Sequence, residues 1–243
     1  MGRNNRFETV IFDLDGTLRH NRPSPNHTFF DFAVGLGVTD SQSKRRRAIR
    51  WAHYYWAQSK ELFEDLESYP EDDRAFWTNF AGRYLRAFGC PQEQASTLSV
   101  QMHQLMSEEY QPEDWVPPEA FEILSELKES RYKLGLVSNR RESAHEQLEA
   151  LGLLPYLDFA FVAGEVNVWK PDPGIFQHAL EVAGSQAEHT VYVGDNYYAD
   201  VIGSRSAGLT PILLDPDEVF PDADCEVIRA LEDLRGILLN HQP

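Results

Sequence analysis

The chain has 243 residues, of which 42% are hydrophobic and 12% aromatic, so it can bury a large core as one domain or as a domain with an insertion. Its formal net charge of −17 argues against a nucleic-acid binder, because that affinity rests mainly on Lys and Arg neutralising phosphates. No apolar run approaches the ~20 residues of a membrane span, and the N-terminal segment lacks the apolar stretch of a secretory signal. We therefore expect a cytoplasmic protein without membrane partners, in which Cys90 and Cys225 are ordinary thiols.

The first predicted element is an apolar run, TVIFDLD at residues 9–15, which is typical of a buried strand ending in two aspartates. The pattern then changes, because helical stretches at 26–37, 41–68, 71–89 and 91–110 follow one another without a convincing strand. These stretches hold much of the aromatic content. We expect residues 22–115 to form an all-helical insertion.

From about residue 118 onward, apolar runs alternate with amphipathic segments. The runs at 133–139, 159–164, 189–195 and 210–215 are typical of buried strands, and 118–130 and 171–184 are typical of helices. In the second helix Asp172 is expected at the N-cap, Pro173 at the first helical position and Gly184 near the end. The alternation predicts an α/β fold with a Rossmann-like, mostly parallel sheet covered on both faces, built from residues 1–21 and 116–243.

Polar residues follow the predicted strands, at the sheet edge where open parallel sheets bind ligands. They are Asp13 and Asp15 after the first strand, Ser138 and Asn139 after the second, Lys170 in the loop after the third, and Asp195 after the fourth, with Asp200 on the helix beyond. Each of them taken singly also fits a turn, a helix cap or a solvated loop charge. Asp172 is explained by its N-cap position and is not assigned to the site.

The joint occurrence of these residues points to a cation. Four aspartates converging on one edge cannot all stay ionised without a counter-charge, because neighbouring carboxylates raise one another's pKa. Mg²⁺ takes oxygen ligands and typically binds through one or two carboxylates together with a substrate phosphate. The residues therefore predict Mg²⁺ as the cofactor.

Four short motifs carry a family resemblance. FDLDGTL, LVSN, KPDP and VGDNYYAD resemble, in order, the four motifs of haloacid dehalogenase (HAD) superfamily hydrolases, and the match covers essentially the whole chain. The helical insertion resembles in architecture the C1-type cap domain of that family. The resemblance implies a phosphatase acting on a small phosphorylated molecule.

The resemblance also implies roles for the acidic pair. Asp13 would attack phosphorus and form an aspartyl-phosphate, and Asp15 would protonate the leaving group and then deprotonate the hydrolytic water. Mg²⁺ would be held by Asp13, the backbone carbonyl of Asp15 and Asp195. Asp200 would be either a direct ligand or a group that orients a metal-bound water or Lys170.

The substrate phosphoryl group would be held by the remaining motif residues. Ser138 and Lys170 would contact its oxygens, Asn139 would lie beside them, and Gly16 and Thr17 would shape the loop around it. We expect these five residues to bind the substrate.

Other functions remain alternatives. A 2-haloacid dehalogenase would use Asp13 but has no need of an acid at position 15, and a phosphomutase would share the same core. A phosphonate hydrolase would need a reactive cap lysine, and Lys44 and Lys60 lie in no apolar setting that would favour one. The non-enzymatic alternative is a phosphate-sensing module without catalytic activity.

The predicted insertion should select the substrate, but its sequence does not identify one. Arg45, Arg46, Arg47 and Arg50 lie beside an aromatic cluster and could hold an anionic group, although such a run is more often a solvated helix face. His20 and Arg22 are equally good candidates for lining the cleft. The sequence leaves the oligomeric state open.

Overall fold

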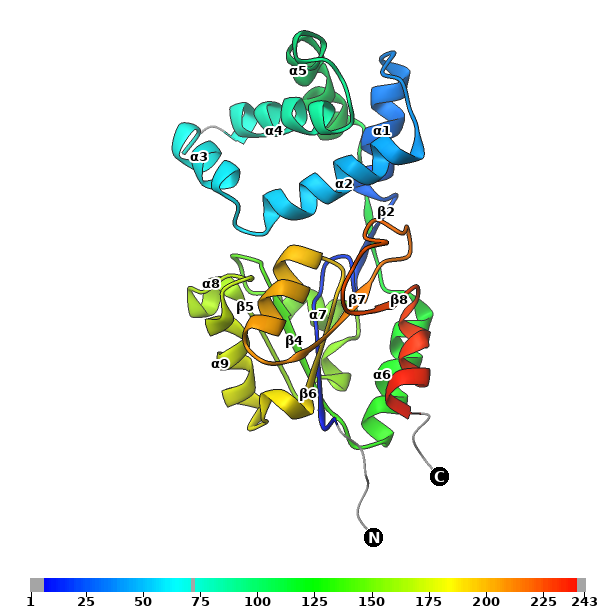
Figure 1. The fold of residues 1–243 in the computed structure, drawn as a ribbon, viewed down its shortest axis with the longest axis vertical. Helices are drawn as coiled ribbons and strands as arrows, with labels where there is room; N and C mark the ends of the chain where they lie inside the picture. The colour runs from blue at the N-terminus through cyan, green and yellow to red at the C-terminus, as the bar shows by residue number, and fades with distance from the viewer. Residues whose placement is uncertain (1–6, 71–72, 240–243) are drawn as a thin grey trace. The chain divides into compact units, whose positions relative to one another are not determined.

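Two compact units make up the computed structural model, which describes residues 7–70 and 73–239 (Figure 1). The core unit combines Met1–His20 with Asp114–Pro243, and the helical unit spans Asn21–Glu113. The helical unit is thus inserted between the first strand of the core unit and the rest of that unit.

A six-stranded sheet forms the centre of the core unit, in the order β5-β4-β1-β6-β7-β8. Its strands are β1 (Thr9–Phe12), β4 (Lys133–Ser138), β5 (Phe159–Val162), β6 (Thr190–Gly194), β7 (Thr210–Leu214) and β8 (Glu226–Ile228). Neighbouring strands pair in parallel throughout, which confirms the predicted α/β fold. Because β1 pairs with β4 on one side and β6 on the other, the strand order reverses beside it, where such sheets bind ligands.

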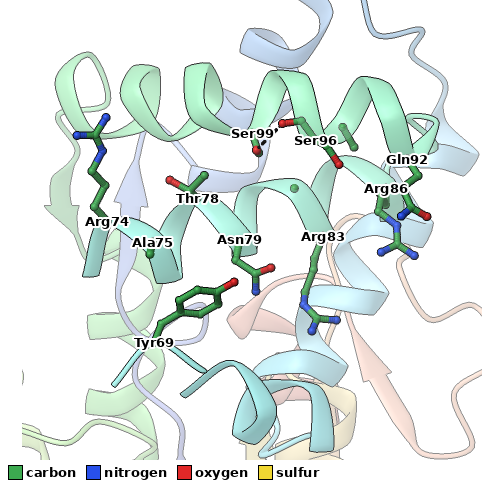
Figure 2. Close-up of a pocket in the computed structure, with 12 residues that line it drawn as sticks. Tyr69, Arg74, Ala75, Thr78, Asn79, Arg83, Arg86, Gln92, Ser96 and Ser99 are labelled. Carbon is green, nitrogen blue, oxygen red and sulfur yellow. Dashed lines mark hydrogen bonds between the residues drawn. The ribbon is translucent and has the colours of Figure 1, made fainter. Parts of the chain in front are cut away.

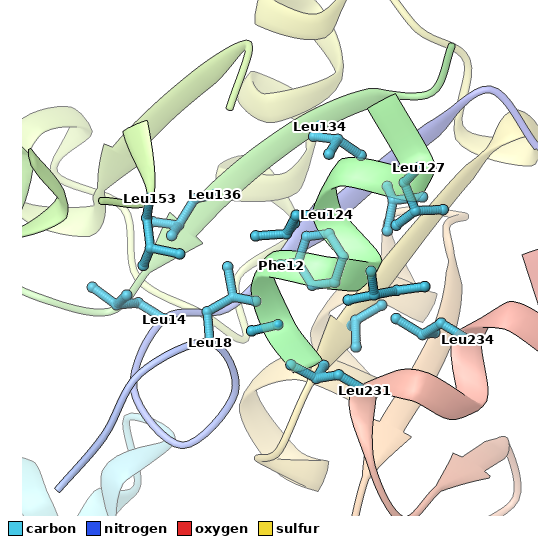
Figure 3. Packing of buried hydrophobic residues seen from close by; sticks show 14 of the residues in the cluster. Phe12, Leu14, Leu18, Leu124, Leu127, Leu134, Leu136, Leu153, Leu231 and Leu234 are labelled. Atoms are coloured by element: carbon cyan, nitrogen blue, oxygen red, sulfur yellow. The ribbon is translucent and has the colours of Figure 1, made fainter. Parts of the chain in front are cut away.

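Helices pack on both faces of this sheet because alternate residues of a strand point to opposite faces. Val10 and Phe12 of β1 belong to the hydrophobic cluster that includes α6 (Pro118–Glu129), and Figure 3 shows Phe12 beside Leu124 and Leu127 of that helix. Ile11 points to the other cluster, which includes α9 (Pro173–Ala183). The strand is fully buried, as expected for the centre of a parallel sheet.

The remaining helices of the core unit are short. They are α7 (His145–Ala150), α8 (Ala163–Val166), α10 (Gly203–Ser206), the 3-10 helices Leu154–Tyr156, Ala187–His189 and Leu231–Asp233, and the π-helices Tyr197–Ile202 and Arg235–Leu239. Helix α9 has the predicted ends, because the Asp172 carboxylate accepts the Gly174 N–H at 2.8 Å and Gly184 closes the helix at φ 60°. The assignment of Asp172 to a cap is thereby confirmed.

The helical unit contains α1 (Pro25–Gly35), α2 (Gln42–Trp56), α3 (Lys60–Ser68), α4 (Asp73–Ala87) and α5 (Gln92–Glu108). Its aromatic residues pack together, with Tyr55 fully buried against Leu62 and Phe76. The stretch 41–68 is two helices, because Gln58 adopts a left-handed φ of 57° and the Ser59 hydroxyl caps α3. Of the helical stretch predicted at 71–89, residues 71–72 lie outside the described residues.

Several predicted boundaries were wrong. The strand predicted at 159–164 ends at Val162, where α8 begins, and β8 was not predicted. Residues 22–115 are not entirely helical, because β2 (His20–Arg22) and β3 (Glu113–Trp115) pair where the chain leaves and re-enters the core unit. Among the helices in the described ranges, none combines the length and apolar character needed to cross a membrane.

A pocket of about 530 Å³ lies within the helical unit, bordered by α4 and α5 (Figure 2). Its walls carry Arg74, Arg83 and Arg86 together with the amide of Asn79. Arg83 is tied to the buried Asp65 carboxylate at 2.8 Å, so its charge is already balanced within the unit. The pocket is polar and cationic, in contrast to the acidic chain as a whole.

Candidate active site

The structure brings together four of the residues predicted from different strand ends. Asp13 directly follows β1, Asp195 directly follows β6, Asp200 lies on the π-helix after it, and Lys170 lies in the loop between α8 and α9. Parallel strands end at the same edge of a sheet, which is why residues separated by up to 187 positions (200 − 13) meet here.

Lys170 connects this group through its ammonium. The Nζ atom lies 2.6 Å from Asp13 Oδ1, 2.7 Å from Asp200 Oδ1 and 3.0 Å from the Tyr192 hydroxyl oxygen. Burial alone would lower the pKa of Lys170, but the charges of Asp13 and Asp200 outweigh it and hold the pKa well above its ordinary value. The side chain is therefore a fixed cation with its three donors used.

Asn139 fixes the backbone of Lys170. Its side-chain oxygen accepts the Lys170 N–H at 2.7 Å, and its amide nitrogen donates to the Lys170 carbonyl at 2.8 Å. This reciprocal pair attaches the lysine loop to the end of β4. The side chain of Asn139, predicted to bind substrate, is thus engaged in holding the lysine in place.

Three carboxylates form a compact cluster. Oxygens of Asp13, Asp195 and Asp200 lie within 4.8 Å of one another. Burial raises the pKa of Asp13 to about 7, with Asp200 adding to the rise and Lys170 opposing it. Burial, together with the charges of Asp13 and Asp200, also raises the pKa of Asp195 well above its ordinary value. An all-oxygen donor set in which ionisation is costly fits a hard divalent cation such as Mg²⁺.

Asp200 is held differently from the other two carboxylates. One of its oxygens accepts from Lys170 Nζ and the other accepts the Asn196 N–H at 2.9 Å. A side chain on Gly194 would overlap the Asp200 carboxylate, so glycine there is what permits this approach. With both oxygens occupied, Asp200 is well placed to orient Lys170.

Gly16 makes a similar close approach on the other side of the cluster. Its φ is +90°, a conformation that side chains rarely adopt, and a Cβ there would overlap the Asp195 carboxylate. Next to it, Thr17 is fully buried, and its hydroxyl has no hydrogen-bond partner within the described ranges. Ser138 is also buried, as the last residue of β4. The loop around the carboxylates therefore contains a hydroxyl that a ligand oxygen could satisfy.

Asp15 has different partners from the three clustered carboxylates. Its carboxylate is 38% exposed and is bound by two guanidinium groups, those of Arg19 and Arg140. The sequence prediction missed both arginines. The only signal was the presence of a basic residue directly after each of two motifs, in FDLDGTLR and LVSNR.

Tyr192 was also missed. It is fully buried in β6, donates its hydroxyl to the Val137 carbonyl at 2.9 Å and accepts from Lys170. Burial raises its pKa well above the ordinary value, so it is a neutral donor and acceptor. A tyrosine within an apolar strand run is normally assigned to the core, and Tyr192 lies there with its polar end at the site.

The arginines considered for substrate selection have contacts within the helical unit. Arg45 pairs with Asp40 at 2.8 Å and with Asp31 at 3.3 Å, and Arg47 donates to the Ala87 carbonyl at 2.8 Å. In the core unit, the His20 ring packs against the Trp115 ring with centroids 5.8 Å apart. Arg45 and Arg47 thus have structural roles in α2 and its neighbours.

Comparisons with known proteins agree on one family. The family model described as haloacid dehalogenase-like hydrolase matches residues 7–208. A haloacid dehalogenase-like hydrolase domain-containing protein 3 from Danio rerio is 30% identical over 207 residues, 84% of each chain. A phosphoserine phosphatase from Thermus thermophilus is 26% identical and covers 96% of this chain and 98% of its own. The structure of a 2-haloacid dehalogenase from Pseudomonas syringae, 24% identical, superimposes with a TM-score of 0.55 over 97% of this chain and 100% of its own, and shows the same fold.

Proposed function

Because the chain belongs to the haloacid dehalogenase-like hydrolases, we propose that it is a Mg²⁺-dependent phosphatase that hydrolyses a small organic phosphate monoester. The observation that carries the proposal is the cluster of Asp13, Asp195 and Asp200 around Lys170, with a second aspartate at position 15. Transfer of a phosphoryl group needs a nucleophile, a proton carrier and positive charge. Asp13, Asp15 and Lys170 would supply them in that order. The proposed helical cap is the unit Asn21–Glu113.

Asp13 is the proposed nucleophile. One of its oxygens is occupied by Lys170, so the other is the oxygen that would attack phosphorus and form the aspartyl-phosphate. Burial makes its negative charge costly, and an ionised carboxylate with little hydration is a stronger nucleophile than a solvated one. The Lys170 ammonium opposes the rise in the pKa of Asp13 and holds the carboxylate in position.

Asp15 is the proposed general acid and base. Its greater exposure puts it in contact with solvent, from which the hydrolytic water must come. In the first step it would give a proton to the leaving oxygen, and in the second it would take a proton from water. The two aspartates, two residues apart, thus have different surroundings that suit different tasks.

We propose that Asp13, the backbone carbonyl of Asp15 and Asp195 hold the metal, and that Asp200 acts through Lys170. When bound, Mg²⁺ supplies positive charge that stabilises the phosphoryl oxygens during transfer. The chain's own contribution to the phosphoryl group is the buried hydroxyl of Thr17, the hydroxyl of Ser138 and the loop conformation at Gly16.

Dehalogenation is the alternative that shares the fold. A halide leaves without a proton, so a metal-independent dehalogenase has no need of a proton donor for the leaving group at position 15, or of carboxylates that hold a metal. Asp15 and Asp195 therefore favour phosphate ester hydrolysis.

A substrate panel tests the proposal. Purified protein is assayed on a set of phosphate monoesters and one 2-haloacid, with Mg²⁺ or with EDTA. We expect Mg²⁺-dependent phosphate release, abolished in Asp13→Asn and retained in the control Asp172→Asn, which changes a helix cap outside the site. Halide release in EDTA, or no phosphate release from any ester by folded protein in Mg²⁺, would contradict the proposal.

A further inference from the structure

The carboxylate of Asp15 is held by a bidentate arginine contact. Arg140 Nε lies 2.6 Å from Oδ2 and Arg140 Nη2 lies 2.6 Å from Oδ1, so the guanidinium binds both oxygens of the carboxylate. Arg19 Nη1 adds a third contact at 2.9 Å to Oδ1. Bidentate arginine–carboxylate pairs are the strong and geometrically specific members of their class.

These contacts continue into a closed ring of five side chains. Arg140 Nη1 donates to the side-chain oxygen of Gln147, Gln147 donates to Asp114, and Asp114 accepts from Arg19 Nε at 3.0 Å. Arg19 then returns to Asp15. We call this set the Asp15 ring: Asp15, Arg19, Asp114, Arg140 and Gln147.

The ring draws on four separate segments of the core unit. Asp15 and Arg19 lie in the loop after β1, Asp114 in β3, Arg140 after β4 and Gln147 in α7. Isolated surface ion pairs contribute little, but a network with a bidentate arginine restricts side-chain orientation. The side chains of Arg19 and Arg140 are only 12% and 27% exposed, so they have little freedom to adopt other positions.

The ring has a direct consequence for proton transfer. A carboxylate has about four lone-pair positions, and three N–H groups of the ring occupy three of those of Asp15. The proton-carrying position is therefore a single, fixed one. General acid–base catalysis depends on such placement, since the carrier must lie within hydrogen-bond distance of the reacting oxygen.

We propose that Arg140 is a positioning residue for Asp15, acting with Arg19 and supported by Gln147. The proposal rests on the proposed function, in which Asp15 carries the proton. It assigns to Arg140 an effect on proton transfer to the leaving group. That effect is separable from general binding of the phosphate, because binding would influence every substrate alike.

The test compares leaving groups. The ratio kcat/KM reports steps up to transfer of the phosphoryl group to Asp13, so it isolates the step in which the leaving oxygen takes a proton. An alkyl phosphate needs that proton, whereas 4-nitrophenyl phosphate needs it far less. We expect Arg140→Met to lower kcat/KM for the alkyl phosphate at least ~10-fold more than for 4-nitrophenyl phosphate, because general acid catalysis supplies ~10²-fold or more.

Three further variants make the test specific. Gln147→Leu breaks the ring without removing a charge. It should also lower kcat/KM more for the alkyl phosphate than for 4-nitrophenyl phosphate, but by a smaller factor than Arg140→Met does. In an Asp15→Asn background, Arg140→Met should add no further selectivity between the two esters. Arg235→Met is the matched control, since Arg235 also forms a double contact with a carboxylate, that of Glu126, elsewhere in the core unit. Arg235→Met should leave kcat/KM unchanged for both esters.

The outcomes separate this proposal from the one it rests on. An equal loss on both esters in Arg140→Met, or additional selectivity in the Asp15→Asn background, would overturn the positioning role while the phosphatase activity stands. Absence of turnover of every ester by the unmodified protein would overturn both.

Discussion

Replacing Asp13 by Asn is expected to stabilise the metal-free protein at pH 8 while abolishing hydrolysis. The buried carboxylate has its pKa raised from 3.8 to about 7, chiefly by burial. The folded state therefore retains a proton that the unfolded state releases. Stability from this group is fully present below about pH 4 and is lost as the pH rises through about 7.

The magnitude follows from the size of that rise. A difference between pKa 3.8 and about 7 corresponds to ~4 kcal/mol at 1.36 kcal/mol for each pH unit. This is an upper value, because Asn is also polar and neighbouring groups relax. Lys170 does not titrate in the same range, since its pKa is held well above its ordinary value. At pH 5 the carboxylate of the unfolded chain is already mostly ionised, 1.2 pH units above its pKa of 3.8, so the variant should already be favoured there by ~1.6 kcal/mol.

The assay is calorimetric unfolding in EDTA at pH 5, 6, 7 and 8. We expect the unfolding temperature of the core unit in Asp13→Asn to exceed that of the unmodified protein by up to ~10 °C at pH 8 and by less than half of that at pH 5. Saturating Mg²⁺ should remove most of the pH dependence of the unmodified protein, because the metal binds the ionised form.

A second buried carboxylate provides the control. Asp215 accepts the N–H groups of Val219 and Phe220 at 2.7 and 2.8 Å, outside the cluster. Asp215→Asn should destabilise the protein in the same assay, because the amide nitrogen would face backbone N–H donors that the carboxylate accepts. A variant Asp13→Asn that is less stable than the unmodified protein at pH 8 in EDTA would refute the reasoning, as would a gain that is the same at pH 5.

Two other substitutions have defined outcomes. Gly16→Ala should raise the Mg²⁺ concentration for half-maximal activity at least ~10-fold, since the new Cβ displaces Asp195. Gly184 also has a positive φ, but a Cβ there would have no atom within 4 Å, so Gly184→Ala should leave that concentration unchanged. An equal effect of the two variants would contradict the contact between residue 16 and Asp195 as the cause. Leu124→Ala should lower the free energy of unfolding by ~3 kcal/mol in urea titrations, because Leu124 is fully buried. Val182 is 49% exposed, so Val182→Ala should lower it by less than ~0.5 kcal/mol. Equal losses in the two variants would contradict the packing shown in Figure 3.

The sheet could be predicted from the sequence because its central strands are continuous apolar runs. Strands buried on both faces need such runs, and a polar residue immediately after one marks the strand end. Asp13 and Asp195 were located in this way, and both directly follow their strands. β8 lacked the signal, since Glu226–Ile228 is three residues long with only Ile228 buried.

Other features depend on contacts that no local pattern encodes. The break between α2 and α3 occurs at Gln58, which adopts a left-handed backbone conformation. Glycine is the usual residue in that conformation, and its absence here left the break without a sequence signal. Tyr192 sits in an apolar run, and only the fold shows that its hydroxyl reaches Lys170. Arg140 and Asp114 join through Gln147, a residue with no motif around it. Long-range polar pairing of this kind follows from tertiary packing alone.

The surroundings of Asp13 and Asp15 explain why two adjacent acids would not exchange roles. Asp13 is almost fully buried, and Lys170 binds it through one oxygen, so its second oxygen can attack. Asp15 has contacts on both oxygens from Arg19 and Arg140 and retains contact with solvent. If the chain attacked with Asp15, the phosphoryl group, which is much larger than a proton, would have to displace arginine contacts from the carboxylate. If Asp13 carried the proton, its burial would hinder exchange with water. The proposed division of tasks therefore rests on which cations the fold places beside each carboxylate, rather than on the spacing of the two in the sequence.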